Sequence, residues 1–258
     1  MKSSEPVGLT EVPITREVVL QLLSHIPRDL ILVGGQALAF WIEHYGIDAT
    51  PATEEDVAYV SRDADFLGKR EHVKVLAEII AGKASYPPRK ALTILCGQIF
   101  VIDDAAGTFM NIDVIHRIGN LDSKAVRTRA VEAAVEGNTF YVMHPLDVLI
   151  SRVENYRGIK EKQSRNGLRQ IELSIAVAKR YVFAAIKRDE GIAIKAIEKV
   201  AEIARSPAGI FARKHGAEIY EAIEPRLLQA KIRNESFLTK RLPILIAEID
   251  RYAGQAQR

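Results

Sequence analysis

The chain has 258 residues, of which 48% are hydrophobic and 27% are charged, a composition ordinary for a globular protein with a buried core. No apolar run approaches the roughly 20 residues that cross a bilayer, and residues 1–13 lack the basic and then apolar layout of a secretory signal. The single cysteine, Cys96, excludes an intramolecular disulfide and a thiolate zinc cluster. We therefore expect a cytoplasmic protein without a membrane partner.

Charge is distributed unevenly along the chain, although the net charge is only +3. Residues 1–151 carry 14 Lys+Arg against 20 Asp+Glu, a net charge of −6, whereas residues 152–258 carry 22 against 13, a net charge of +9. An acidic first part suits carboxylates that hold cations, and a basic second part suits phosphates. Long solvated helices also carry many Lys and Arg residues, so the charge alone leaves both interpretations open.

Helical and extended patterns alternate over the first part of the chain. Apolar spacing predicts helices over residues 15–26, 36–45 and 71–81, the second of them closed by Gly46. Short apolar runs predict strands over residues 30–33, 57–60, 63–67, 91–102 and 108–115. A turn over residues 103–107 makes the last two strands an antiparallel pair, and residues 131–142 predict one more hairpin, around Gly137-Asn138.

The pattern becomes helical from His144 onward. Pro145 suits the first position of a helix, and a long helix follows a polar stretch at residues 157–166. Later breaks are expected at Gly191, Ser206-Pro207, Gly216 and Pro225. The predicted fold class is α/β (α+β): a small mixed sheet in a domain of residues 1–143, followed by an all-α domain of residues 144–258.

Three aspartates are the strongest candidates for chemistry. Asp63 and Asp65 stand two positions apart on a predicted strand, so that both face the same side with Cα atoms roughly 6.5 Å apart. A divalent cation relieves the repulsion between such carboxylates. Asp113, on a predicted neighbouring strand, would complete a site for two Mg²⁺ (or Mn²⁺) ions about 3.5–4 Å apart. Taken alone, an Asp-x-Asp pair is also typical of a solvated strand end or a helix N-cap.

Gly34-Gly35 lies between a predicted strand and a predicted helix. Such a turn brings backbone N–H groups and the positive end of the helix dipole close to an anion. A tight strand-to-helix turn without a ligand would show the same pattern. The run is neither a Walker A loop nor a dinucleotide fingerprint, since it lacks the Lys and the third glycine of those motifs.

The order of strand, Gly-Gly, helix, Asp-x-Asp and a later strand aspartate resembles the core of the DNA polymerase β-like nucleotidyltransferase superfamily. The run Gly34-Gly35-Gln36-Ala37-Leu38 is most similar to the nucleotidyltransferases of bacterial abortive-infection and toxin–antitoxin systems. The resemblance covers about residues 28–118 well and the helical remainder only loosely. Gln36 departs from it, because Ser or Thr is frequent at that position in the superfamily, and so does the lack of a Lys-Asp pair on a later helix.

By this resemblance Gly34 and Gly35, with Gln36 after them, would hold the triphosphate of an NTP. Asp63 and Asp65 would bind the metal, and Asp113 would complete the site and help to deprotonate the acceptor hydroxyl. A Lys of the toxin-like members has its nearest counterpart here in Arg152. Arg152 and Asn155 lie three positions apart on one helical face, from which they could reach a nucleotide.

The resemblance implies a metal-dependent transferase that moves a nucleotidyl group from an NTP to an acceptor hydroxyl. The acceptor could be RNA (notably a tRNA end), a protein or a small molecule, and the basic second part favours nucleic acid. A cognate antitoxin protein is a further expected partner. The alternative is a non-catalytic member of the fold that binds a nucleotide or a partner, which the departures favour and the three intact aspartates oppose. A third possibility is a helical antitoxin-like or structural protein with the α/β part as a scaffold.

Overall fold

The computed structural model describes residues 6–50 and 62–253. Within these ranges the chain forms two compact units, unit 1 with residues 6–44 and 62–151, and unit 2 with residues 45–50 and 152–253. The boundary lies inside the helix α5 (Pro145–Gly158), whereas the sequence places it before that helix, at residues 143/144. The first turns of α5 belong to unit 1, and Leu146, Val148 and Leu149 on these turns are buried.

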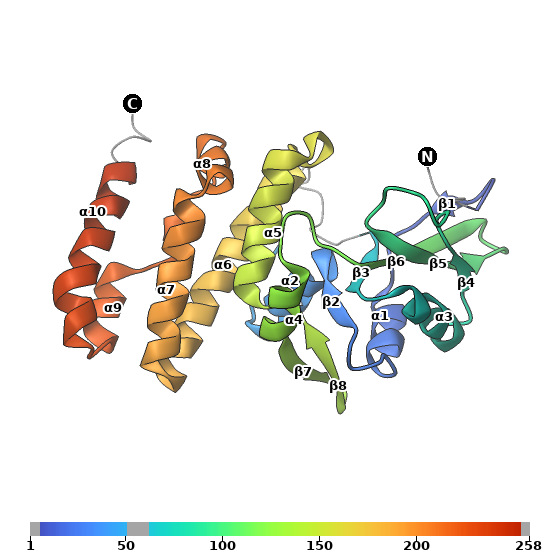
Figure 1. The fold of residues 1–258 in the computed structure, drawn as a ribbon, viewed down its shortest axis with the longest axis horizontal. Coiled ribbons are helices and arrows are strands. Elements are labelled where there is room, and N and C mark those ends of the chain that lie inside the picture. Colours follow the sequence, from blue (N-terminus) through green and yellow to red (C-terminus); the bar gives the residue numbers. More distant parts are fainter. Residues whose placement is uncertain (1–5, 51–61, 254–258) are drawn as a thin grey trace. The chain divides into compact units, whose positions relative to one another are not determined.

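Unit 1 is built on a mixed sheet, which contains eight strands among the described residues (Figure 1). The strands are β1 (Thr10–Glu11), β2 (Ile31–Val33), β3 (Ala64–Leu67), β4 (Lys83–Ser85), β5 (Leu95–Asp103), β6 (Thr108–Ile115), β7 (Val131–Val135) and β8 (Asn138–Val142). Their order is β4-β5-β6-β3-β2-β8-β7, with β1 beside β6. In the centre β3 runs parallel to β6 and antiparallel to β2.

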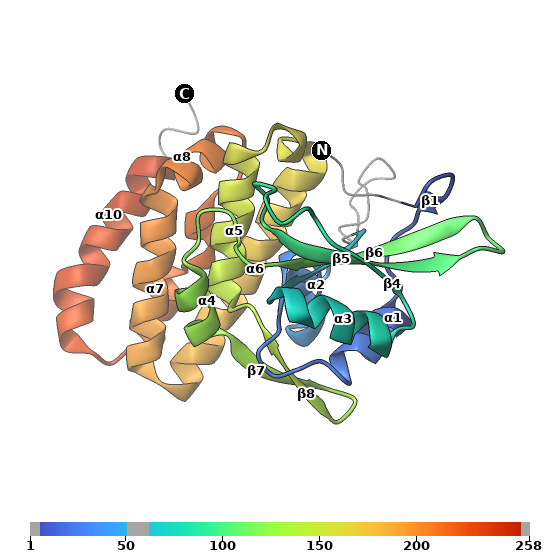
Figure 2. The ribbon, with the colours of Figure 1, turned by 45° about the vertical axis from the view of Figure 1, so that its right-hand side comes forward.

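Four further helices belong to unit 1: α1 (Arg16–Leu23), α2 (Gly34–His44), α3 (Arg70–Ile79) and α4 (Ser123–Arg129). The helices α1 and α3 lie side by side, and α3 packs on β5 and β6 (Figure 2). The side chains of Val73 and Leu76 on α3 are fully buried, as is that of Ile99 on β5. This apolar layer fixes the strands that carry the site, because burying large side chains is the main stabilising contribution in such a core.

Both predicted hairpins are present. The strands β5 and β6 pair antiparallel across a turn that contains Gly107 at a φ of +65°. The strands β7 and β8 meet at Glu136-Gly137, with φ values of 51° and 84°, which is typical of a two-residue type I′ turn. The sequence places that turn one residue too late, at Gly137-Asn138, because Asn138 pairs with Val135 as the first residue of β8.

Other differences concern element bounds. The helix predicted from Gln36 begins at Gly34. The strands β1 and β4 and the helix α4 are not predicted, since each is too short to show a period. The strand predicted over residues 57–60 lies outside the described residues.

Unit 2 is all-helical within the described residues, so that the prediction of a mixed α/β part followed by a helical part is confirmed. Besides the end of α5 it contains α6 (Arg165–Arg188), α7 (Glu190–Arg205), α8 (Pro207–Lys214), α9 (Pro225–Lys231), α10 (Leu242–Ala253) and the short turns η1 (Lys160–Lys162), η2 (Ile219–Ala222) and η3 (Phe237–Arg241). The N-cap side chains of Asp189 and Ser206 separate α6 from α7 and α7 from α8. The break expected at Gly191 therefore lies at Asp189. None of the described helices has the length and apolar character to cross a membrane.

Candidate metal centre

Asp63, Asp65 and Asp113 converge at the centre of the sheet. The strands β3 and β6 are parallel neighbours, and their register places Asp65 directly beside Asp113. Asp63 precedes β3 by one residue and stands two positions before Asp65, which brings it to the same face. One carboxylate oxygen from each residue lies within 4.8 Å of the other two, and all three side chains are half-buried.

The opposite face of the same strands is apolar, and it fixes this register. Ala64 and Phe66 on β3 alternate with the aspartates and have no exposed surface, and the same is true of Ile112 and Val114 beside them on β6. A slip of one residue would move this apolar set to the aspartate face. Burial of one face therefore dictates that the carboxylates share the other.

Asp113 is held by two neutral amides. Gln98 Nε2 and Asn111 Nδ2 each donate a hydrogen bond to Asp113 Oδ1, both at 2.9 Å. Burial raises the pKa of the Asp113 carboxyl above its usual range, the two amide hydrogen bonds lower it, and the nearby Asp63 raises it further. Neither amide carries a charge, so these two hydrogen bonds do not neutralise the Asp113 carboxylate.

Gly34 closes the site from β2. Val33, the last residue of β2, pairs with Asp65, and Gly34 follows with a φ of +65°. A Cβ atom on this residue would lie 2.0 Å from Asp65 Oδ2, which is closer than any non-bonded contact allows. Glycine is therefore required at residue 34 both by the backbone conformation and by the approach of Asp65. Gly35, by contrast, is a buried residue of α2 without a positive φ.

The donor set fits a hard divalent cation. Three carboxylates supply oxygen ligands, which Mg²⁺ and Mn²⁺ prefer, and the three aspartates bring neither thiolate nor imidazole. Like charges at this separation repel one another, and a bound cation would remove that repulsion. The acidic cluster predicted from the sequence is thus present in the fold with the proximity that a metal ion needs.

Three other predicted site residues lie on α2 and α5. Gln36 is half-buried in the first turn of α2. Arg152 and Asn155 belong to unit 2, where they line one hollow of about 10 Å³, roughly the space of a single water. Arg152 is buried, and its Nη1 donates to Gln170 Oε1 at 2.9 Å. A role of these residues in nucleotide binding stays a prediction.

Gln98 and Asn111 are site residues that the sequence analysis does not identify. Both are 8% exposed, although their neighbours along the strands are apolar. Asn111 shows a signal in the sequence, since it stands two positions before Asp113 on the same strand face. Gln98 shows no such signal in the sequence. Its role becomes visible only from the register of the hairpin, which places Gln98 directly opposite Asp113.

Comparisons with known proteins add no family to this geometry. No protein-family model matches the sequence, and no curated protein matches it either. Function is therefore inferred from the residues of the site and from their arrangement.

Proposed function

We propose that unit 1 is a metal-dependent nucleotidyltransferase, which moves a nucleotidyl group from an NTP to an acceptor hydroxyl. One observation supports this proposal above the rest: three carboxylates lie within 4.8 Å of one another beside the Gly34 turn that opens α2. Carboxylates alone are compatible with many metal sites. Their position next to a strand–glycine–helix turn adds a place for phosphate, and that combination favours a nucleotide.

Asp63, Asp65 and Asp113 would hold Mg²⁺ or Mn²⁺, which supplies charge stabilisation to the phosphates during transfer. The bond between the acceptor oxygen and the α-phosphorus forms, the bond from that phosphorus to the bridging oxygen breaks, and pyrophosphate leaves. The acceptor proton would go to the Asp113 carboxylate, the role that the family resemblance implies for this residue.

The triphosphate would bind at the start of α2. The first backbone N–H groups of a helix have no acceptor within the helix, and its dipole favours an anion there. Gly34 and Gly35 add no side chains to this turn, so a phosphate could approach its backbone N–H groups, while Asp65 fills the space that a Gly34 side chain would take. Asp65 lies against Gly34, which would set the cations and the phosphates side by side.

Unit 2 carries a basic groove that we propose as the binding surface for an RNA acceptor. Two hollows, of about 420 and 310 Å³, lie along one face of α6 and share Arg180 and Phe183. The residues that line them are Ile47, Asp48, Ala176, Lys179, Arg180, Phe183, Ile186, Lys187, Leu227 and Lys231. Four of these residues are cationic and one is acidic. Lys179 forms an ion pair with Glu224 at 3.2 Å, so Arg180, Lys187 and Lys231 are the cations that favour a polyanion here.

The aromatic ring of Phe183 makes this groove suitable for binding single-stranded nucleic acid. Its half-buried ring borders both hollows, and Lys179 Nζ lies 6.0 Å from the ring centroid. Aromatic rings among cations bind single-stranded nucleic acid by stacking with bases, with little preference for sequence. This groove thus supports RNA as the acceptor class, whereas a small-molecule acceptor would need no such surface.

Radiolabel transfer tests the proposal. The purified chain is incubated with each of four α-labelled NTPs, Mg²⁺ and either total RNA, a protein extract or no acceptor. We expect label to enter RNA, to depend on Mg²⁺ and to disappear with a chelator. Tight NTP binding without any transfer would instead identify the non-catalytic alternative, and the absence of both binding and transfer would refute a nucleotide function.

A further inference from the structure

Asp113 differs from an ordinary carboxylate ligand because its two oxygens are unequal. Oδ1 accepts hydrogen bonds from Gln98 Nε2 and Asn111 Nδ2, both at 2.9 Å, which uses both of its lone pairs. No hydrogen-bond donor among the described residues reaches Oδ2. A cation or an acceptor hydroxyl therefore finds one available oxygen on this residue, and that oxygen is Oδ2.

The fold places both amides there independently. Gln98 on β5 lies directly across the hairpin from Asp113, and residues opposite each other in an antiparallel pair share a face. Asn111 reaches the same face from β6, two positions before Asp113. Gln98 Nε2 also lies 3.5 Å from Asn111 Oδ1, which links the amides to each other. The three side chains form a closed triangle of hydrogen bonds on the sheet.

The choice of neutral donors matters for a metal centre. An Arg or Lys at either position would orient Asp113 equally well, but its positive charge would repel the cation. Buried amides orient the carboxylate and stabilise its anionic form without reducing the negative charge of the cluster. Phe100 lies opposite Asn111 across the pair and is buried, and in these apolar surroundings Gln98 Nε2 also donates to Asn111 Oδ1 at 3.5 Å.

We infer that Gln98 and Asn111 are positioning residues, which lock Asp113 through Oδ1 and thereby fix Oδ2 as its single functional oxygen. This inference rests on the proposed metal-dependent function of the cluster. Loss of either amide leaves one lone pair of Oδ1 unoccupied and lets the carboxylate rotate, so that it no longer presents Oδ2 alone. Loss of both should abolish the orientation.

Mn²⁺ titration calorimetry of the full-length chain tests the inference, with Gln98→Met and Asn111→Leu as variants of similar shape that lack the donor. Ile99→Val is the matched control: it lies on β5 and is fully buried, and it pairs with Ile112 on the opposite face. We expect each amide variant to weaken Mn²⁺ binding about tenfold and the double variant to weaken it further, whereas Ile99→Val binds as the wild type does. Kinetics with Mn²⁺ and NTP should show kcat falling while the KM for NTP stays nearly constant.

Two outcomes would overturn the inference, and they differ. If the wild type binds Mn²⁺ and transfers label while both amide variants match Ile99→Val, the amides are structural and the proposed function stands. If the wild type binds no Mn²⁺, the metal centre is wrong and the positioning role falls with it. Thermal melts of all variants show whether a loss of binding reflects unfolding, because Ile99→Val lowers stability without contacting Asp113.

Discussion

Gly34 and Asp65 are packed so closely that a methyl group on Gly34 would lie 2.0 Å from Asp65 Oδ2. The contact joins two parts of the site that are separate in the sequence, the glycine turn before α2 and the acidic pair of β3. A side chain on Gly34 would therefore both narrow the proposed phosphate site and displace the Asp65 carboxylate.

Replacement of Gly34 with Ala should therefore damage the metal centre as well as the backbone. Gly46→Ala is the matched control, since Gly46 has a similar φ of +59° but a methyl group added to it would meet no atom within 4 Å. We expect Gly46→Ala to lose about 1 kcal/mol of unfolding free energy and no Mn²⁺ affinity. Gly34→Ala should lose more stability and about tenfold or more in Mn²⁺ affinity. Equal Mn²⁺ affinity in the two variants would show that Gly34 does not position Asp65.

Asp113→Asn should stabilise the metal-free protein at neutral pH. Because burial raises the pKa of Asp113 in the fold, the folded chain binds this proton more tightly than the unfolded chain does. Its contribution to stability is therefore largest at low pH and falls as pH rises through the folded pKa. We expect the variant, in a chelator, to melt about 2 °C or more above wild type at pH 7 and no higher near pH 3. A lower melting temperature at pH 7 would mean that the charged carboxylate stabilises the fold.

A second pH dependence comes from His144, just before α5. Burial lowers the pKa of His144 from 6.5 to about 4, with Asp147 opposing the shift and Arg129 adding to it. The folded chain thus binds this proton less tightly than the unfolded chain, so stability is full above pH 6.5 and is lost towards pH 4. The loss amounts to up to about 3 kcal/mol. Urea denaturation of His144→Gln should show a shallower decline over this window, and an unchanged decline would refute the assignment.

Much of the candidate site could be predicted because it depends on local patterns. The strand alternation that sets Asp63 and Asp65 on one face and the glycines before α2 are visible in a few consecutive residues. Gln98 was not, because its role depends on register. The turn predicted over residues 103–107 would pair Ile102 with Thr108, and it would place Gln98 opposite Ile112. The actual hairpin pairs Asp103 with Thr108, and this shift of one residue brings Gln98 opposite Asp113.

Prediction of the secondary structure was limited in the same way, because it also depends on patterns within consecutive residues. Long helices such as α6 have enough turns for their apolar period to appear, whereas the three residues of β4 do not. The unit boundary inside α5 was equally hidden, because a helix that is apolar on both sides of residue 151 carries no break in its sequence.

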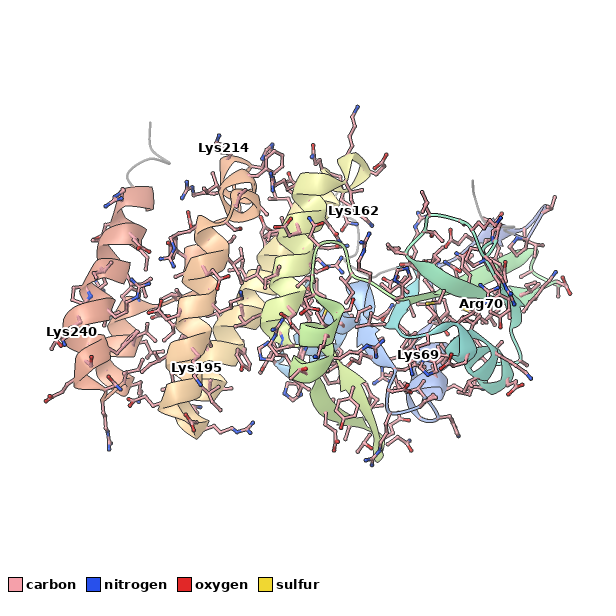
Figure 3. The ribbon with its side chains drawn as sticks, in the orientation of Figure 1. Lys69, Arg70, Lys162, Lys195, Lys214 and Lys240 are labelled. Atoms are coloured by element: carbon pink, nitrogen blue, oxygen red, sulfur yellow. The ribbon has the colours of Figure 1, made fainter. Side chains whose placement is uncertain are left out.

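The basic groove of unit 2 predicts a steep dependence of RNA binding on salt. Each neutralised phosphate of a single strand adds about −0.7 to the slope of log K against log salt concentration. The double variant Lys187→Glu/Lys231→Glu should reduce the slope by about 1.4 or more and leave NTP affinity unchanged. Lys214→Glu, at the end of α8 and outside both hollows, is the control (Figure 3). Equal slopes in all three proteins would remove RNA from the proposal.

The proposal that Asp63, Asp65 and Asp113 form a catalytic metal centre is tested most directly by Mg²⁺-dependent label transfer from NTP in Asp63→Asn. Asp104→Asn, an exposed carboxylate in the β5–β6 turn, is the matched control. We expect Asp63→Asn to lower kcat about a hundredfold or more with the melting temperature unchanged or higher, and Asp104→Asn to behave as the wild type. Undiminished transfer by a folded Asp63→Asn protein would contradict the assignment of the metal centre.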